Sequence, residues 1–144
     1  MSSTWLLFLY KVPPRPTARR VYVWRKLKRL GAILLHDALW VLPDTPRTRE
    51  QFQWLAAEIG ELGGDAWLWE GQLTQSAQDE TLVQQFLVQV ETAYGEILAG
   101  LKRKKPDLAA LSRRYQQISA EDYFHSKVGE QVRAALLSAR GGGD

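Results

Sequence analysis

The order in which strand-like and helix-like patterns alternate over residues 5–71 is the feature that most constrains the fold. Six apolar or aromatic residues, Trp5–Tyr10, come first, followed by a helical pattern over 17–30 and by two short strand patterns within 32–43. A second helical pattern and a last strand pattern complete the order β-α-β-β-α-β. Right-handed crossovers then favour a ferredoxin-like sandwich, in which two helices pack on one face of an antiparallel sheet.

Local signals indicate where these elements begin and end. The first strand is apolar on both alternating faces, which predicts a central strand covered on both sides. Gly31 follows the first helical pattern, as expected of a residue that ends a helix. Thr48 and Gln51 have the spacing of a capping box and predict the start of the second helix. The last strand of this part is predicted over Asp65–Gly71.

Beyond a polar link at 74–78, the sequence predicts only helices. A heptad-like seam alternates spacings of four and three residues along the first of these helices, at Val83, Leu87, Val90, Tyr94, Ile97 and Leu101. Because a long exposed apolar stripe normally marks an interface, Leu87, Val90, Tyr94 and Ile97 are predicted to form the seam of a homodimer.

The predicted fold class is therefore α+β, with a ferredoxin-like β-α-β-β-α-β sandwich followed by a C-terminal helical segment of about three helices. We expect the ferredoxin-like domain at 1–73 and the helical segment at 79–140, packed on that domain or on a second subunit. Most of the six tryptophans are expected to fill the sandwich core. Trp54 lies off the apolar stripe of its helix and is a candidate for a contact surface.

Charge is segregated along the chain. Residues 1–43 hold eight basic residues and one acidic residue, a local net charge of +7 on a chain whose total is +3. Residues 44–101 carry −8, and residues 102–144 carry +4. Such a concentration indicates an anionic partner, with duplex DNA as the favoured one. The alternative is a solvated basic face that pairs with the acidic residues of 44–101.

The helix predicted over 17–30 separates an apolar stripe from a basic face. Val23, Leu27 and Leu30 form the stripe, and the cations fan over roughly the opposite half of the helical wheel. Arginines on this face can make bidentate bonds to phosphates, and a tyrosine among them offers contact surface. The predicted nucleic-acid-binding residues are Arg19, Tyr22, Arg25, Lys26, Lys28 and Arg29.

Other basic residues allow different interpretations. Lys11, Arg15 and Arg20 lie near the end of the first strand and the start of the first helix, where they can gather around an oxyanion such as chromate or sulfate. The run at 102–105 ends a predicted helix, where the helix dipole favours cations whatever the function.

No pattern predicts catalysis or a cofactor. The chain has no cysteine, which excludes disulfides, thiolate metal sites and cysteine nucleophiles. A polar turn explains His36 and Asp37 as well as a metal-binding or pH-sensitive pair does, and His125 has the same status. No catalytic residue, metal or cofactor is therefore predicted. No apolar run approaches the roughly 20 residues of a membrane-spanning helix, and no signal-peptide pattern precedes the first strand. A cytoplasmic protein without a membrane partner is expected.

Several ordered motifs carry a resemblance to a known family. They are Tyr10-Lys-Val-Pro13, Val23-Trp-Arg-Lys-Leu-Lys-Arg-Leu-Gly31, Leu39-Trp-Val-Leu-Pro43, Phe52-Gln-Trp-Leu-Ala56 and Ile118-Ser-Ala-Glu-Asp-Tyr-Phe124. Over residues 5–139 the chain resembles the N-terminal domain of the ChrB family of chromate-responsive regulators. This resemblance implies a DNA-binding transcriptional regulator, or a component of one, in chromate resistance, with chromate or sulfate as effector. The alternative is an oxyanion-binding accessory protein of chromate resistance that does not bind DNA.

The first 71 residues also resemble the ferredoxin-like CRISPR nucleases and the middle domain of PaaX-type repressors. In those nucleases the first strand ends in an aspartate that holds a catalytic metal, and Lys11 occupies that position here. A lysine repels a hard cation instead of coordinating it. A metal-dependent nuclease is therefore the least favoured function.

Overall fold

The computed structural model describes residues 3–141. The chain divides into two compact units, the first ending at Asp79 and the second beginning at Glu80. The elements that begin in the first unit are, in chain order, β1 (Trp5–Lys11), α1 (Thr17–Arg29), β2 (Ile33–His36), β3 (Leu39–Pro43), α2 (Pro46–Glu61), β4 (Asp65–Gly71) and the long helix α3 (Ser76–Leu101).

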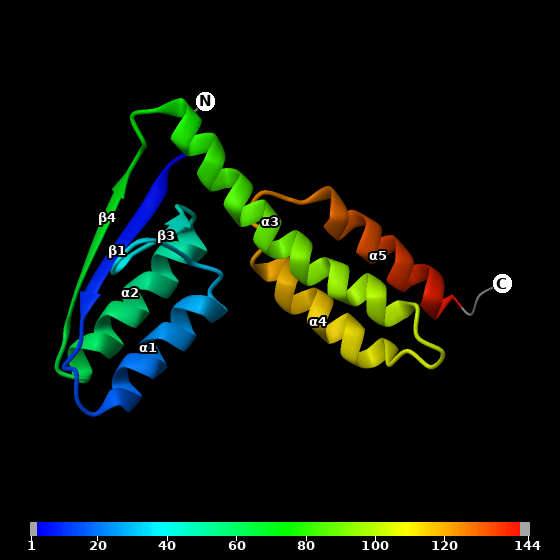
Figure 1. Ribbon diagram of the computed structural model, residues 1–144, viewed down its shortest axis with the longest axis horizontal. Coiled ribbons are helices and arrows are strands. Elements are labelled where there is room, and N and C mark those ends of the chain that lie inside the picture. The colour runs from blue at the N-terminus through cyan, green and yellow to red at the C-terminus, as the bar shows by residue number, and fades with distance from the viewer. Residues whose placement is uncertain (1–2, 142–144) are drawn as a thin grey trace. The chain divides into compact units, whose positions relative to one another are not determined.

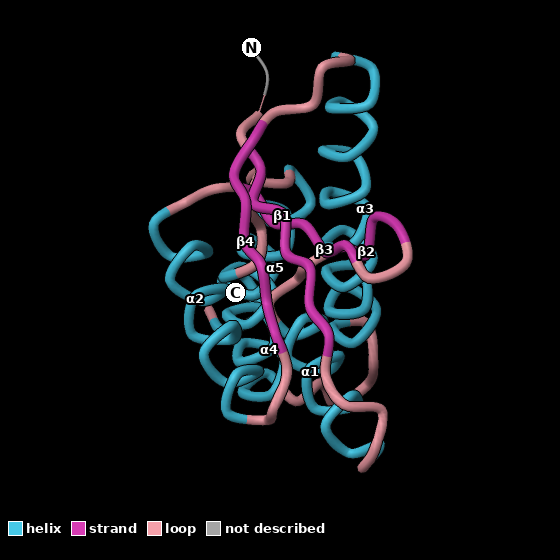
Figure 2. Tube along the Cα trace, turned by 90° about the vertical axis from the view of Figure 1, so that its left-hand side faces the viewer, coloured by secondary structure: helices cyan, strands magenta, loops and turns pink. Residues whose placement is uncertain are grey.

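The strands of the first unit form one antiparallel sheet in the order β2-β3-β1-β4. β1 is central, because Leu7 lies opposite Val41 of β3 on one side and opposite Trp69 of β4 on the other. Both α1 and α2 lie on one face of this sheet (Figure 1), behind β1 and β4 in the view of Figure 2. The element order, the strand order and the one-sided helices are those of a ferredoxin-like sandwich, so the predicted α+β fold is confirmed.

The two faces of the sheet differ in burial. On the face toward the helices, Phe8 of β1 stacks on Phe52 of α2 with their ring centroids 4.7 Å apart, and both side chains are fully buried. On the other face, Leu9, Trp67 and Trp69 remain 39%, 58% and 47% exposed. The expectation that β1 is covered on both sides is therefore wrong, because both crossover helices pack on the same face.

The tryptophans correct a second expectation. Only Trp5 and Trp40 are buried, so most of the six tryptophans do not fill the core. Tryptophan suits the pleated surface of a strand on either face, and a strand pattern alone cannot show which face is packed. The exposed tryptophans are Trp24, Trp54, Trp67 and Trp69, and the exposure of Trp54 agrees with its place off the apolar stripe of α2.

The N-cap of the second helix lies three residues before the predicted one. Thr45 is the N-cap, and its side chain accepts a hydrogen bond from the Thr48 backbone N–H at 3.0 Å. The Thr45 N–H donates to Thr48 Oγ1 at 2.9 Å, which completes the box. The prediction that Thr48 and Gln51 form the box is wrong, because Pro46 suits the first helical position and Thr48 takes the place usually held by glutamate or glutamine.

The second unit is helical, as predicted. It contains most of α3 and two further helices, α4 (Leu108–Ala120) and α5 (Lys127–Arg140). Figure 1 shows α4 and α5 beside the C-terminal part of α3. No helix within residues 3–141 is both long enough and apolar enough to cross a membrane.

The heptad-like seam of α3 is covered by the chain's own helices. Val90, Tyr94 and Ile97 are at most 5% exposed and form one core cluster with residues of α4 and α5, namely Ile118, Val132 and Leu136. Leu87 is half-buried. The premise that this stripe is exposed is wrong, since two following helices provide the partner surface that the pattern alone left open. The homodimer stays a prediction that this seam no longer supports.

A hydrogen-bond network fixes the turn between α4 and α5 to α3. The Tyr94 hydroxyl donates to Asp122 Oδ2 at 3.0 Å, and the Asp122 carboxylate also accepts from the Ser126 backbone N–H. The Ser126 hydroxyl in turn donates to Glu91 Oε2 at 3.1 Å. Burial, together with the hydrogen bond to the Asp122 carboxylate, raises the pKa of Tyr94.

Two helical glycines test the packing of this unit. A methyl group on Gly129 of α5 would lie 2.9 Å from ring atoms of Tyr94, whereas one on Gly95 of α3 would meet nothing within 4 Å. Gly129→Ala should therefore lower the free energy of unfolding by about 1–3 kcal/mol through overpacking. Gly95→Ala should raise it by about 0.5–1 kcal/mol, because alanine favours the helix. Urea unfolding measures both, and equal effects would contradict the packing of α5 on α3.

The Tyr94 network predicts a loss of stability at alkaline pH. Because the pKa of Tyr94 is raised in the folded state, its contribution is complete below about pH 10 and is lost as the pH rises toward the raised value. Tyr94→Phe should cost about 1.5–3 kcal/mol at neutral pH, the usual worth of a hydrogen bond to a charged group. The variant should then lose less stability than the parent between about pH 9 and pH 11. Parallel pH profiles of the parent and the variant would refute this.

Candidate nucleic-acid interface

The sheet determines which face of α1 reaches the solvent. Val23 and Leu27 are fully buried, and they fix the inner side of the helix. The helix ends at Arg29 with Leu30 as its C-cap, and Gly31 follows with a φ of 80°, a left-handed conformation that glycine adopts without strain. The Ala32 N–H then donates to the Leu27 carbonyl at 3.1 Å, so the chain turns directly into β2.

The outer face of α1 carries three exposed cations that make no ion pair with any residue of 3–141. Arg25, Lys28 and Arg29 are spaced three and four residues apart and are therefore neighbours on the helix surface. Both ion pairs found within residues 3–141 belong to Arg49, with Asp44 and Glu70. If the acidic residues of 44–101 neutralised this basic face, they would form ion pairs with the cations of α1. No such ion pair is found in the described part of the chain.

The other predicted residues of α1 face α2. Arg19 is half-buried and its Nη1 donates to the Leu62 carbonyl at 3.0 Å, where α2 ends. The Tyr22 hydroxyl donates to the Glu58 carboxylate of α2, and this hydrogen bond is the main cause of the raised pKa of Tyr22. Lys26 lies with its Nζ 5.7 Å from the centroid of the Tyr22 ring. The structure therefore places Arg19 and Tyr22 at the contact between the two helices, with Lys26 beside Tyr22 on α1.

Two apolar residues of the outer face escaped the sequence prediction. Trp24 is 49% exposed, and the Lys28 Nζ lies 5.6 Å from the centroid of its indole ring. Val21 is exposed on the same side of the helix. Trp24 lies at the margin of the apolar stripe on the helical wheel. A residue at this margin can belong either to the core or to the surface, and the wheel alone does not decide between them. The interface proposed below consists of Val21, Trp24, Arg25, Lys28 and Arg29.

The three residues of the oxyanion alternative lie on different elements. Lys11 ends β1 opposite Asp65, Arg15 lies in the loop after it, and Arg20 is in the first turn of α1. All three are exposed. The charge of Arg20 lowers the pKa of Tyr10, although burial has the larger effect and raises it.

The backbone conformation explains why aspartate and histidine occupy the turns at Asp37 and His125. Asp37 has a φ of 45° between β2 and β3, and His125 has a φ of 53° before α5. Aspartate and histidine are enriched among non-glycine residues in this left-handed region. Among residues 3–141 there is no group of three or more histidine, aspartate or glutamate side chains that could hold a metal ion.

Comparison with known proteins shows similarity to one protein family. The sequence model described as "Protein ChrB, N-terminal" matches residues 20–121, well over half of the chain. A protein named ChrB from Cupriavidus metallidurans (strain ATCC 43123 / DSM 2839 / NBRC 102507 / CH34) is 28% identical over 107 residues, which are 74% of this chain and 32% of the relative. The chain thus spans about a third of the length of that relative.

The two groups of cations on α1 should respond differently to mutation. Arg19→Met removes the guanidinium that bonds the carbonyl of Leu62, the C-cap of α2, and we expect it to cost about 1–2 kcal/mol of unfolding free energy. Arg25→Met removes an exposed cation without a partner and should change stability by less than about 0.5 kcal/mol. Urea unfolding compares them, and an equal cost would show that the outer face also has a structural role.

Proposed function

Since the chain belongs to the family of the ChrB N-terminal region, we propose that it is a DNA-binding transcriptional regulator, or a component of one, acting in chromate resistance in the cytoplasm. The observation that carries the DNA-binding proposal is the cluster of Arg25, Lys28 and Arg29 on the outer face of α1, exposed and without ion pairs. Three adjacent positive charges without counter-charges favour a polyanion as partner.

The three cations have complementary roles in this proposal. Arg25 and Arg29 present planar guanidinium groups that can bond two phosphate oxygens at once, and Lys28 adds a point charge between them. Release of counterions from DNA then supplies much of the binding free energy. The buried stripe of Val23 and Leu27 holds the helix on the sheet, so only the side chains of the cations, and not the helix backbone, must be ordered when DNA binds.

The apolar residues of the same face suit a helix that lies against a groove. An α-helix fits the major groove of duplex DNA, where thymine presents its methyl group. Val21 and Trp24 flank the cations and can contact such methyl groups or the sugars beside them. In this arrangement the cations position the helix, and the apolar contacts add the preference for particular bases.

An oxyanion-binding accessory protein remains the second candidate from the family resemblance, with Lys11, Arg15 and Arg20 as its residues. It has less structural support, because the described residues show no pocket or shared hydrogen bond that joins these three exposed side chains at a strand end, a loop and a helix start. A small anion needs donors that converge on one point.

The DNA-binding proposal predicts a specific change in salt dependence. Arg25→Gln, Lys28→Gln and Arg29→Gln together should weaken binding of duplex DNA at least tenfold at about 100 mM salt. The slope of log affinity against log salt should become shallower by about 3, since up to three phosphate contacts disappear. Fluorescence anisotropy with labelled duplex from the protein's own upstream region measures both quantities.

A matched variant separates this site from general charge. Lys102→Gln, Arg103→Gln and Lys104→Gln also remove three exposed positive charges, but from the segment after α3. We expect this variant to keep affinity within about twofold and to keep the parent's slope. Equal losses in the two variants, or unchanged binding in the first, would exclude the outer face of α1 as the DNA-binding site.

A further inference from the structure

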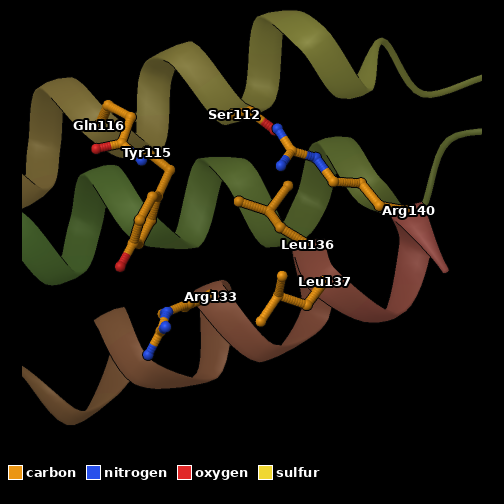
Figure 3. Close-up of a pocket in the computed structure, with 7 residues that line it drawn as sticks. All are labelled: Ser112, Tyr115, Gln116, Arg133, Leu136, Leu137 and Arg140. Carbon is orange, nitrogen blue, oxygen red and sulfur yellow. The ribbon is translucent and has the colours of Figure 1, made fainter.

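Two surfaces outside α1 differ in how well they define a partner. One is a pocket of about 110 Å³ between α4 and α5 (Figure 3). Its Arg133 side chain is turned away from Arg140 and Ser112, so the polar groups of the pocket do not converge on one ligand. The other is the face of the sheet opposite α1 and α2, and its side chains form a more specific pattern.

This sheet face carries an exposed patch on β1 and β4, the strands nearest the viewer in Figure 2. Residues directly opposite each other on antiparallel strands point to the same side of the sheet. The patch consists of three such pairs, Leu7 with Trp69, Leu9 with Trp67, and Lys11 with Asp65. We call these six residues the β1–β4 patch. The two indole rings are about half exposed, and their centroids lie 6.4 Å apart.

The β1–β4 patch combines an apolar centre with one charge of each sign at one end. Lys11 and Asp65 are both exposed, and neither forms an ion pair with any residue of 3–141. A surface that binds single-stranded nucleic acid needs several cations along the strand, whereas the only cation of the patch lies beside an acid. The pattern therefore favours a protein surface that is itself apolar at the centre and carries both charges.

We propose that the β1–β4 patch binds a second copy of this chain and forms a reversible homodimer. The two copies face each other across a two-fold axis that is parallel to the strands and midway between β1 and β4, so β1 of each copy lies over β4 of the other. Each Leu9 then faces Trp67 of the partner subunit, and each Lys11 faces Asp65 of the partner subunit. Small side chains meet large ones and cations meet anions, as aligned packing of two sheets about 10 Å apart requires.

The size of the patch indicates a weak dimer. The two half-exposed indoles contribute roughly 200–250 Å² per copy, and the whole patch stays below the about 800 Å² that each partner buries in a standard interface. We expect a dissociation constant on the order of 10 μM. The patch shares no residue with the outer face of α1, which lies on the opposite side of the sheet, so this proposal stands or fails independently of DNA binding.

Sedimentation velocity of the full chain between about 1 and 200 μM tests the dimer. The average mass of the parent should rise from that of a monomer to that of a dimer over this range. Trp67→Thr with Trp69→Thr should weaken association at least tenfold, and threonine keeps the preference of these positions for a strand. The matched control is Trp54→Gln, which removes an exposed indole from α2 and should change association by less than about twofold.

A charge exchange tests the orientation of the two copies. Lys11→Asp leaves two acidic residues at this end of the patch, whereas Asp65→Lys leaves two basic ones. Each variant alone should associate at least threefold more weakly than the parent, because like charges then meet across the axis. An equimolar mixture should associate at least threefold more strongly than either variant alone, as measured by energy transfer between separately labelled copies. Damage to the sheet within one copy cannot produce this gain, so the mixture remains decisive if the double tryptophan variant does not fold.

Several outcomes would overturn the proposal. A parent that stays monomeric up to about 200 μM would do so, as would a dimer that the double tryptophan variant leaves intact or that Trp54→Gln weakens equally. A mixture that associates no better than its components would refute the pairing of β1 with β4 across the axis. Binding of single-stranded DNA by the monomer through Trp67 and Trp69 would make the patch a base-stacking surface instead. The triple variant of α1 should keep the dimer, and loss of the dimer there would also contradict this interface.

Discussion

The first unit depends on the pairing of β1 with a strand on each side. Because β3 and β4 both bond to β1 antiparallel, the crossovers through α1 and α2 must run over the sheet, and both lie on the same face. Val23 and Leu27 then pack toward the sheet, and the opposite side of α1 points away from it. The exposure of Arg25, Lys28 and Arg29 is thus a consequence of strand order, which explains why a fold argument is needed before any argument about charge.

The cations of α1 fall into two groups with different surroundings. Arg19 bonds a carbonyl at the end of α2 and the Tyr22 hydroxyl bonds Glu58 of α2, and these contacts hold α1 to α2, whereas Lys26 lies over the Tyr22 ring of its own helix. Among the acidic residues of 44–101, Asp44 and Glu70 pair with Arg49 near the start of α2 and Glu58 bonds Tyr22, and within residues 3–141 none forms an ion pair with Arg25, Lys28 or Arg29. Like charges kept adjacent on one helix repel one another. That cost is tolerated most readily where a partner supplies the counter-charge.

Periodicity in the sequence was sufficient to predict the element order, the central place of β1 and the three C-terminal helices. It failed to predict burial where burial depends on which other element packs against the residue. Trp67 and Trp69 fit a strand equally well on a packed or an open face, and Tyr94 fits a seam whether α5 or a second subunit covers it. Thr48 fits both the N-cap and the third helical position, and only the geometry around Pro46 separates them. The pocket around Ser112 has no sequence signature at all, because α4 and α5 create it by packing together.

The shape of the surface decides which anions the arginines of α1 favour. Arg25 and Arg29, which form no ion pair within residues 3–141, stand on the convex side of a helix, where water reaches them from most directions and a lone small anion gains little over its hydration. A polyanion overcomes this limit, since its regularly spaced charges engage several cations at once and release counterions. Convex placement therefore favours DNA over a single small oxoanion as the partner of α1.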